Sequence, residues 1–230
     1  MRLPTIQELS RLTRLSAGRL KLVTLAPELP GAMEVIRWCS RHGIVVSLGH
    51  SDADGATAAR AVNSGARAVT HMFNGMRPFH HRNPSLVDVA LTHPRVAAMV
   101  IADGIHVSQT ALRLLLRTKG PGAVALVTDS VRHQGWPVRE RGGAYYTRRG
   151  VLAGSHLTMI QAVRNAVLLG SASLSEAVRM ASEVPTKLLR LLDSSGTLAL
   201  GKRADLVAFT REFRVVMTMV GGRIVYRHGV

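Results

Sequence analysis

Short apolar runs alternate with longer segments of helical periodicity along the first half of the chain. The apolar runs predict strands at residues 21–26, 44–48, 66–70, 96–102 and 123–128. The periodic segments predict helices at residues 2–18, 31–42, 52–64 and 108–118. Strands and helices that alternate in this way form a parallel sheet with right-handed crossovers. The pattern therefore predicts an α/β fold.

The middle of the chain predicts a hairpin and two further helices. The hairpin joins residues 145–147 to residues 150–152 and belongs to an Arg-rich segment that also contains Trp136. This segment is either a lid or an ordinary surface hairpin. The helices are expected over residues 157–169 and 174–192, with a break at Pro185 in the second.

The last part of the chain predicts a small antiparallel sheet. Its strands are expected at residues 204–209, 215–220 and 223–226. Gly221 and Gly222 separate the last two strands, and a two-glycine loop is typical of a tight hairpin turn. We therefore expect two domains, residues 1–195 and residues 196–230.

The composition is that of a globular protein, with 230 residues of which 47% are apolar. No apolar run reaches 18 residues, and the first 19 residues are interrupted by charges. We therefore expect no transmembrane helix, no signal peptide and a cytoplasmic location. The single cysteine, Cys39, excludes an intrachain disulfide and is expected to be a buried structural thiol.

The chain is strongly basic, with 30 Lys and Arg against 14 Asp and Glu and a formal net charge of +16. Such a charge raises the question of nucleic-acid binding. However, the arginines are scattered singly and only 4% of the residues are aromatic, so there is no basic motif with rings for base stacking. An Arg-rich surface, or attraction of an anionic substrate, explains the charge with fewer assumptions.

Two histidines stand at equivalent ends of consecutive strand-helix units. His50 follows the strand at residues 44–48, and His71 follows the strand at residues 66–70. The carboxyl ends of parallel strands face one shared rim, so the two imidazoles should converge there and could bind a metal. The alternative is that each is a partly buried histidine satisfied by ordinary hydrogen bonds.

Later strands end in further polar residues. Asp103 and His106 follow the strand at residues 96–102, and Asp129 follows the strand at residues 123–128. A carboxylate at the end of an apolar strand, close to a bound cation, suits a general base, and Asp129 has the best position for that role. The alternative is an aspartate that caps a helix or forms a turn.

Seven segments carry a resemblance to a known family and cover nearly the whole chain. They are VTLAPE (23–28), GIVVSLGHSDA (43–53), THMFNGM (70–76), IADGIHV (101–107), LVTDS (126–130), LAGSHLTMIQAVRN (152–165) and GTLALGKRADLVAF (196–209). In this order and spacing the chain resembles the C-terminal two thirds of the N-acetylglucosamine-6-phosphate deacetylase family, in the amidohydrolase superfamily.

The resemblance implies a partial (β/α)8 TIM-type barrel, about strands 4–8, in residues 1–195, and the C-terminal strands of a small β-sandwich in residues 196–230. It implies metal-dependent hydrolysis of the acetamide of N-acetylglucosamine 6-phosphate, with one zinc ion, or iron or another divalent ion instead. It also implies a homodimer that binds an amino sugar phosphate, and neither a membrane nor nucleic acid.

The resemblance also assigns roles to single residues. His50 and His71 match the family's metal-binding histidines, and Asp129 matches its catalytic aspartate. Arg82 matches the arginine that holds the phosphate, for which a planar guanidinium is well suited. The other residues that match substrate contacts are Asn74, Gly75, His106, Leu152, Ala153, Gly154 and Ser155.

The chain departs from the family in its metal ligands. The family's third ligand is a glutamate in a His-Leu-Glu-Gly-Pro motif, which does not occur in these 230 residues, and Glu28 is not its equivalent. Five strands cannot close an eight-stranded barrel. We therefore expect an N-terminally truncated chain that self-associates and has little activity. The alternatives are a catalytically silent sugar-phosphate-binding protein and a basic nucleic-acid-binding protein.

Overall fold

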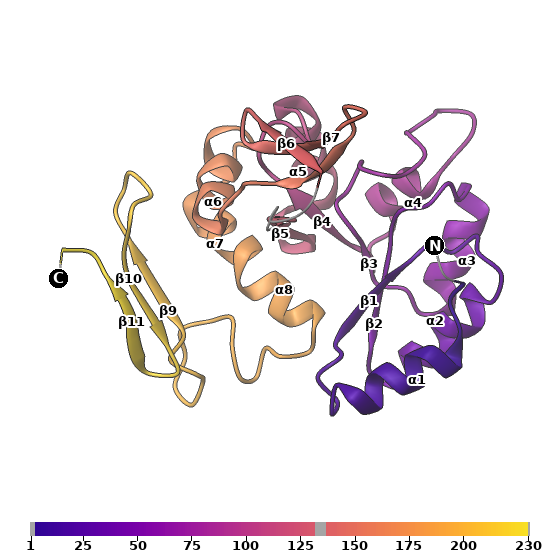
Figure 1. Ribbon diagram of the computed structural model, residues 1–230, viewed down its shortest axis with the longest axis horizontal. Coiled ribbons are helices and arrows are strands. Elements are labelled where there is room, and N and C mark those ends of the chain that lie inside the picture. The colour runs from indigo at the N-terminus through magenta and orange to yellow at the C-terminus, as the bar shows by residue number, and fades with distance from the viewer. Residues whose placement is uncertain (1–2, 132–136, 230) are drawn as a thin grey trace. The chain divides into compact units, whose positions relative to one another are not determined.

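The computed structural model describes residues 3–131 and 137–229, and its main sheet follows the predicted alternation (Figure 1). The five strands lie in the order of the chain: β1 (Leu22–Leu25), β2 (Val45–Leu48), β3 (Ala68–Val69), β4 (Ala97–Ile101) and β5 (Val124–Val127). The pairs β1·β2, β2·β3 and β3·β4 are parallel. Each strand falls inside a predicted apolar run, so the prediction of a parallel α/β sheet is confirmed.

One helix precedes the first strand, and the others connect successive strands of the sheet. They are α1 (Ile6–Leu15), α2 (Ala32–Arg41), α3 (Gly55–Ser64), α4 (Leu86–Thr92) and α5 (Gln109–Lys119), and a 3-10 turn, η1, covers Pro121–Ala123. Side chains fix several starts: Thr5 caps α1 and Asp54 caps α3. Helix α4 was not predicted, because it has only two turns. It is stabilised by a capping box between Ser85 and Asp88.

The chain forms two compact units, which we describe separately. The first unit contains residues 1–100 and 117–125, and the second contains residues 101–116 and 126–230. In the first unit, α2 packs on β2 and α3 lies beside α2. The core of the first unit includes Ile36, Val46, Leu48 and Val62, each no more than 1% exposed. Cys39 is buried there as a free thiol, as predicted, and burial raises its pKa to about 11.

Besides most of α5, the second unit contains α6 (Met159–Leu168), α7 (Leu174–Ala181) and α8 (Glu183–Leu188). The predicted break at Pro185 is wrong, because the helices separate at Ser182 and Pro185 lies inside α8. Pro185 is the third residue of α8, where a backbone N–H has no partner within the helix. A proline is therefore tolerated at this position and does not end the helix.

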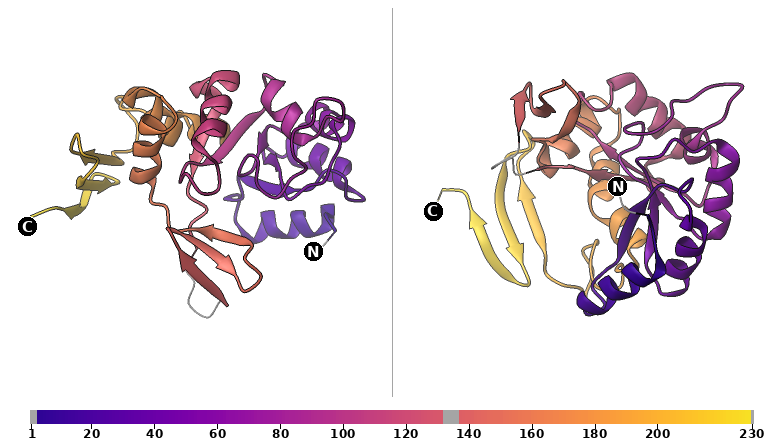
Figure 2. Two further views of the ribbon diagram at one scale, coloured as in Figure 1. Left: turned by 90° about the horizontal axis from the view of Figure 1, so that it is seen from above. Right: turned by 45° about the vertical axis from the view of Figure 1, so that its right-hand side comes forward.

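Two antiparallel sheets complete the second unit (Figure 2). The first consists of β6 (Val138–Arg141), β7 (Ala144–Thr147) and β8 (Leu152–Ser155). It confirms the predicted hairpin and adds β6, whose Arg-rich sequence gave no strand signal. Trp136 lies outside the described residues, and the choice between lid and surface hairpin stays open.

The second antiparallel sheet consists of β9 (Leu206–Phe209), β10 (Val215–Val220) and β11 (Arg223–Arg227). Gly221 and Gly222 form the predicted turn with φ values of 55° and 80°, which glycine adopts readily. None of the residues in these three strands is buried. The domain boundary between residues 195 and 196 stays a prediction.

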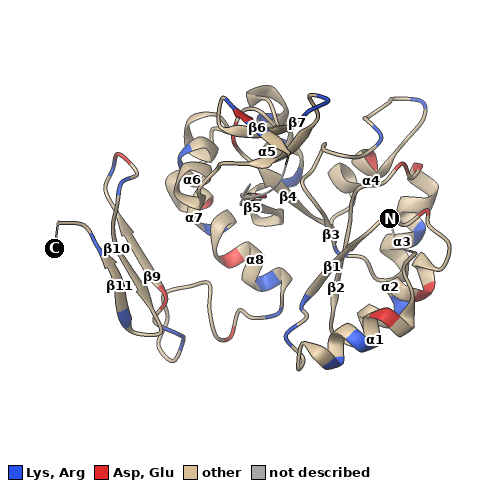
Figure 3. Ribbon diagram, in the orientation of Figure 1, with Lys and Arg blue, Asp and Glu red and all other residues tan. Residues whose placement is uncertain are grey.

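Charged residues are spread over the described chain. Lys and Arg occur on helices, strands and loops of both units (Figure 3). No helix within residues 3–131 and 137–229 is long and apolar enough to cross a membrane.

Candidate active site

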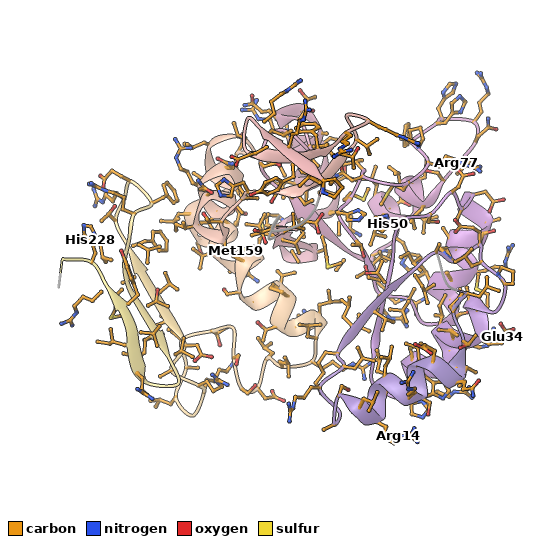
Figure 4. All side chains as sticks on the ribbon, viewed as in Figure 1. Arg14, Glu34, His50, Arg77, Met159 and His228 are labelled. Atoms are coloured by element: carbon orange, nitrogen blue, oxygen red, sulfur yellow. The ribbon has the colours of Figure 1, made fainter. Side chains whose placement is uncertain are left out.

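The structure brings the two predicted metal-binding histidines together in the first unit. His50, labelled in Figure 4, follows β2, and His71 follows β3. Their Nε2 atoms are 2.8 Å apart, and the ring planes meet at 87°. His71 is 7% exposed, whereas His50 is open to solvent. The two imidazoles converge as the sequence predicted, and their rings are in direct contact.

Three of the predicted site residues that are not glycine have left-handed backbone conformations. The φ values are 50° at His50, 32° at His71 and 48° at Asp129. Residues with a Cβ atom rarely adopt such values, because the side chain crowds the backbone. Non-glycine residues of this kind are concentrated at functional sites, where surrounding contacts hold them in place. The conformations thus support a functional role for these strand ends.

The histidine pair offers two of the donors that a metal ion needs. Two imidazole nitrogens bound to one tetrahedral zinc ion lie about 3.3 Å apart, so the rings need to separate only slightly to hold one. Catalytic zinc usually takes three protein ligands. No group of three or more His, Cys, Asp or Glu side chains in the described parts of the chain could hold a metal. The residues therefore fit a metal but supply only part of its coordination.

Gly75 lies directly against both imidazoles. A Cβ atom at this position would be 3.3 Å from Nδ1 of His50 and 3.7 Å from Cε1 of His71. The φ value of Gly75 is 58°, and its carbonyl accepts a hydrogen bond from the N–H of Ser51. Asn74 uses its side-chain amide to donate to the carbonyls of His71 and Met72. Both predicted residues thus shape the loop that surrounds the histidines.

Glu28 braces the loop that carries His50. Its two carboxylate oxygens accept hydrogen bonds from Oγ of Ser51 and from the N–H of Asp52, both at 2.7 Å. Ser51 is buried, and its Oγ in turn accepts from the N–H of Ala53. Glu28 was excluded as a metal ligand on the sequence, and the structure shows both of its oxygens engaged with this loop.

Arg82 lies on an exposed loop of the first unit. Its guanidinium is 2.9 Å from Nε2 of His81, and it lines an open pocket of about 780 Å³ together with Asp54 and Asn83. Arg77, labelled in Figure 4, lines the same pocket. The carboxylate of Asp52 binds Arg77 through two hydrogen bonds, which hold the pKa of Asp52 below its usual value. Arg82 makes no ion pair within the described residues.

In the second unit, Asp129 meets the predicted substrate segment of β8. Its carbonyl accepts a hydrogen bond from the N–H of Ser155, and a Cβ atom at Gly154 would be 3.1 Å from the same oxygen. The hydroxyl of Ser155 donates to the carbonyl of Thr128. Asp129 is exposed and no helix begins at it, so the helix-cap alternative does not apply. Leu152 and Ala153 begin the same strand.

His106 forms a buried pair with Asp103 in the second unit. Nδ1 of His106 is 2.6 Å from Oδ2 of Asp103, and each side chain is 4% exposed. The sequence suggested His106 as a substrate contact but gave Asp103 no role. Their spacing of three residues, Asp-x-x-His, is the signal that could have found the pair. The partners of Glu28 come from another strand end, so spacing could not reveal them.

Comparisons with known proteins identify relatives of this chain. The N-acetylglucosamine-6-phosphate deacetylase of Vibrio furnissii is 37% identical over 96% of this chain and 58% of its own length. The N-acetylgalactosamine-6-phosphate deacetylase of Escherichia coli O157:H7 is 36% identical over 95% of this chain and 60% of its own length. A mutant N-acetyl-D-glucosamine-6-phosphate deacetylase from Mycobacterium smegmatis, solved with N-acetyl-D-glucosamine-6-phosphate, superposes on this chain with a TM-score of 0.90.

That structure is 32% identical and is matched over 98% of this chain and 62% of its own length. The chain therefore spans less than two thirds of the length of each of these relatives. The likeness confirms the expected fold class, a partial (β/α)8 barrel with the C-terminal strands of a β-sandwich. The sequence model of the amidohydrolase family matches residues 3–225, and the chain belongs to that family.

Proposed function

We propose that this chain carries the site of a deacetylase that hydrolyses the acetamide of N-acetylglucosamine 6-phosphate, giving glucosamine 6-phosphate and acetate. The observation that carries the proposal is the contact between His50 and His71 at the ends of two parallel strands. The names of the relatives support an amino sugar phosphate as the substrate class.

Amidohydrolases are generally metal-dependent, and His50 and His71 are the residues that would hold the ion here. Zinc is the first choice, with iron or another divalent ion as alternatives. A divalent ion at this position would polarise the acetamide carbonyl and lower the pKa of bound water towards about 7. Gly75 leaves the space that both rings need, and Glu28 keeps the loop of His50 in place.

Asp129 is the proposed general base and acid. Its backbone is fixed by Ser155 while its carboxylate is exposed, so it can accept a proton from the attacking water and deliver it to the leaving amine. Arg82 is proposed to bind the phosphate as a bidentate donor. Asn74, Gly75, His106 and residues 152–155 are proposed to surround the sugar.

One observation favours a second candidate, a sugar-phosphate-binding protein without turnover. The described residues supply two metal ligands, fewer than the three usual at catalytic zinc. Such a protein would bind N-acetylglucosamine 6-phosphate and release no acetate. The homodimer and the cytoplasmic location stay predictions from the sequence.

The test compares the 230-residue chain with the product of the reading frame extended upstream of Met1. Bound zinc and acetate release from N-acetylglucosamine 6-phosphate and N-acetylgalactosamine 6-phosphate are measured for both. In whichever of these two proteins releases acetate, Asp129→Asn should lower turnover by about 10²- to 10⁴-fold with substrate binding retained. Asp193→Asn, at an exposed site, is the matched control. Zinc binding without acetate release from either form would favour the binding protein.

A further inference from the structure

The segment that follows β4 is held rigidly at both of its ends. Ala102 and Val107 are buried, and the side-chain amide of Asn165 in α6 donates to the carbonyl of Ala102 at 2.8 Å. Between them the chain turns at Gly104, whose φ is 79°. Asp103 and His106 therefore project from a fixed backbone, and their contact is set by the fold.

The carboxylate of Asp103 is fully engaged inside this turn. Oδ1 accepts hydrogen bonds from the N–H groups of Ile105 and His106, at 2.8 Å and 2.7 Å. Oδ2 faces Nδ1 of His106 at 2.6 Å, which is typical of a strong, charge-assisted hydrogen bond. The carboxylate of Asp103 thus stabilises the turn and also contacts the imidazole of His106.

The proton in this contact belongs to the imidazole. Burial opposes ionisation of Asp103, but the hydrogen bonds from the His106 ring and the two backbone N–H groups hold its pKa below the usual value. An ionised carboxylate can only accept hydrogen bonds, so Nδ1 of His106 must be the donor. In a neutral ring the other nitrogen, Nε2, then carries a lone pair.

We infer that Asp103 is a positioning residue that keeps neutral His106 protonated on Nδ1, so that Nε2 accepts a hydrogen bond from a hydroxyl of the bound amino sugar phosphate. The choice of ligand rests on the proposed function. Nε2 has no hydrogen-bond partner among residues 3–131 and 137–229. A ring locked in this state discriminates between ligand groups, since it favours a donor such as a hydroxyl and opposes a carbonyl oxygen.

Asp103→Asn separates this role from a purely structural one. The amide oxygen of asparagine can still accept from the N–H groups of Ile105 and His106, so the turn is preserved. Its NH₂ group, however, can only donate towards Nδ1. The ring proton should therefore move to Nε2, which converts the ligand-facing nitrogen from an acceptor into a donor. His106→Gln provides a variant that lacks the ring.

The experiment records ¹⁵N solid-state spectra of the chain labelled at histidine, at alkaline pH, because these spectra report the tautomer whether or not the chain associates. The signals missing in His106→Gln identify His106. We expect a protonated Nδ1 in the wild-type chain and in the control Asp193→Asn, and a protonated Nε2 in Asp103→Asn. A wild-type ring protonated on Nε2, or the same tautomer in Asp103→Asn, would overturn the inference.

A second measurement tests the ligand. Addition of N-acetylglucosamine 6-phosphate should shift the Nε2 signal of the wild-type chain, and in the active form Asp103→Asn should lower kcat/KM by about 10- to 100-fold, mainly through KM. An unshifted Nε2 signal in ligand-bound protein would overturn the assigned contact. Failure of the proposed function is seen separately, as absence of acetate release from the wild-type protein, and the spectra still decide the tautomer.

Discussion

The histidines after β2 and β3 differ from the histidine after β4 in what their rings contact. Nε2 of His50 and Nε2 of His71 are 2.8 Å apart, and Gly75 lies against both rings. Nδ1 of His106 is 2.6 Å from the carboxylate of Asp103, and both side chains are buried. Two imidazole nitrogens aimed at one point are suited to a cation, whereas a carboxylate behind an imidazole fixes its tautomer.

The difference shows that strand-end position alone does not define the role of a histidine. All three residues follow strands of the same sheet. His50 and His71 were selected from the sequence for that reason, whereas His106 was selected through the family resemblance. The neighbouring groups decide whether the ring offers a lone pair to a metal or to a hydroxyl. Variants that change those neighbours can therefore test the comparison.

The largest effect is expected for zinc binding. His50→Ala or His71→Ala removes one of two donor nitrogens, so zinc affinity should fall by more than the roughly 10- to 100-fold typical of outer-shell substitutions. His106→Gln should leave zinc affinity unchanged. Equilibrium dialysis with metal analysis measures all three variants. Wild-type zinc content in either alanine variant would show that this histidine is not a metal ligand. A lower zinc affinity in His106→Gln would show that the Asp103–His106 pair also takes part in metal binding.

Much of the fold could be predicted from the sequence, because strands and helices leave strong local patterns. Every strand of the main sheet lies within a predicted apolar run, and the three C-terminal strands follow their predicted ranges closely. Helix α4 was missed because seven residues are too few for a clear helical period. The break at Ser182 was misplaced because a proline in the first turn of a helix does not end it.

The candidate site was predictable only where one residue and its strand were sufficient. His50, His71 and Asp129 each end an apolar run, and the positive φ values at all three add a feature that the sequence cannot show. The brace from Glu28 to Ser51 joins the ends of β1 and β2, so it depends on the register of two strands. The pairing of Asp103 with His106 depends on a turn conformation.

The pH dependence of stability should distinguish the carboxylate-bound histidine. The pKa of Asp103 is lower in the folded state than the usual 3.8, because hydrogen bonds from His106 and two N–H groups outweigh the effect of burial. As the pH falls below 3.8, Asp103 is protonated in the unfolded chain before it is protonated in the folded chain. The free energy of unfolding that the ionised carboxylate contributes is therefore complete above pH 3.8 and is lost as the pH falls through the folded pKa.

Urea unfolding of the wild-type chain and Asp103→Asn, from pH 7 to pH 3, measures this effect. At neutral pH the variant should be less stable by about 1–3 kcal/mol, since a charge-assisted hydrogen bond to the ring is replaced by a neutral one. The gap should narrow as the pH falls below about 4. If the difference in unfolding free energy between the two proteins stays constant to pH 3, the pKa of Asp103 is not lowered by folding.

Gly75 tests whether the loop sets the spacing of the metal-binding rings. Gly75→Ala and Gly221→Ala place a methyl group at nearly equal φ values, 58° and 55°, so each should cost about 1–2 kcal/mol of unfolding free energy. Only Gly75→Ala brings that methyl against His50 and His71, since nothing lies within 4 Å at Gly221. Zinc affinity should fall in Gly75→Ala alone. Equal zinc affinity in both variants would mean that the rings adjust without this space.

Glu28→Gln should have the smallest effect and separates a brace from a ligand. Glutamine has a single acceptor oxygen in place of the two that receive Ser51 Oγ and the N–H of Asp52, so one hydrogen bond is lost. The expected cost is about 0.5–1.5 kcal/mol, against less than about 0.5 kcal/mol for the exposed control Glu34→Gln. Zinc stoichiometry should be unchanged, because the carboxylate acts on the loop of His50 and not on the cation. Loss of zinc to the extent seen in His50→Ala would make Glu28 a ligand and supply the missing third donor.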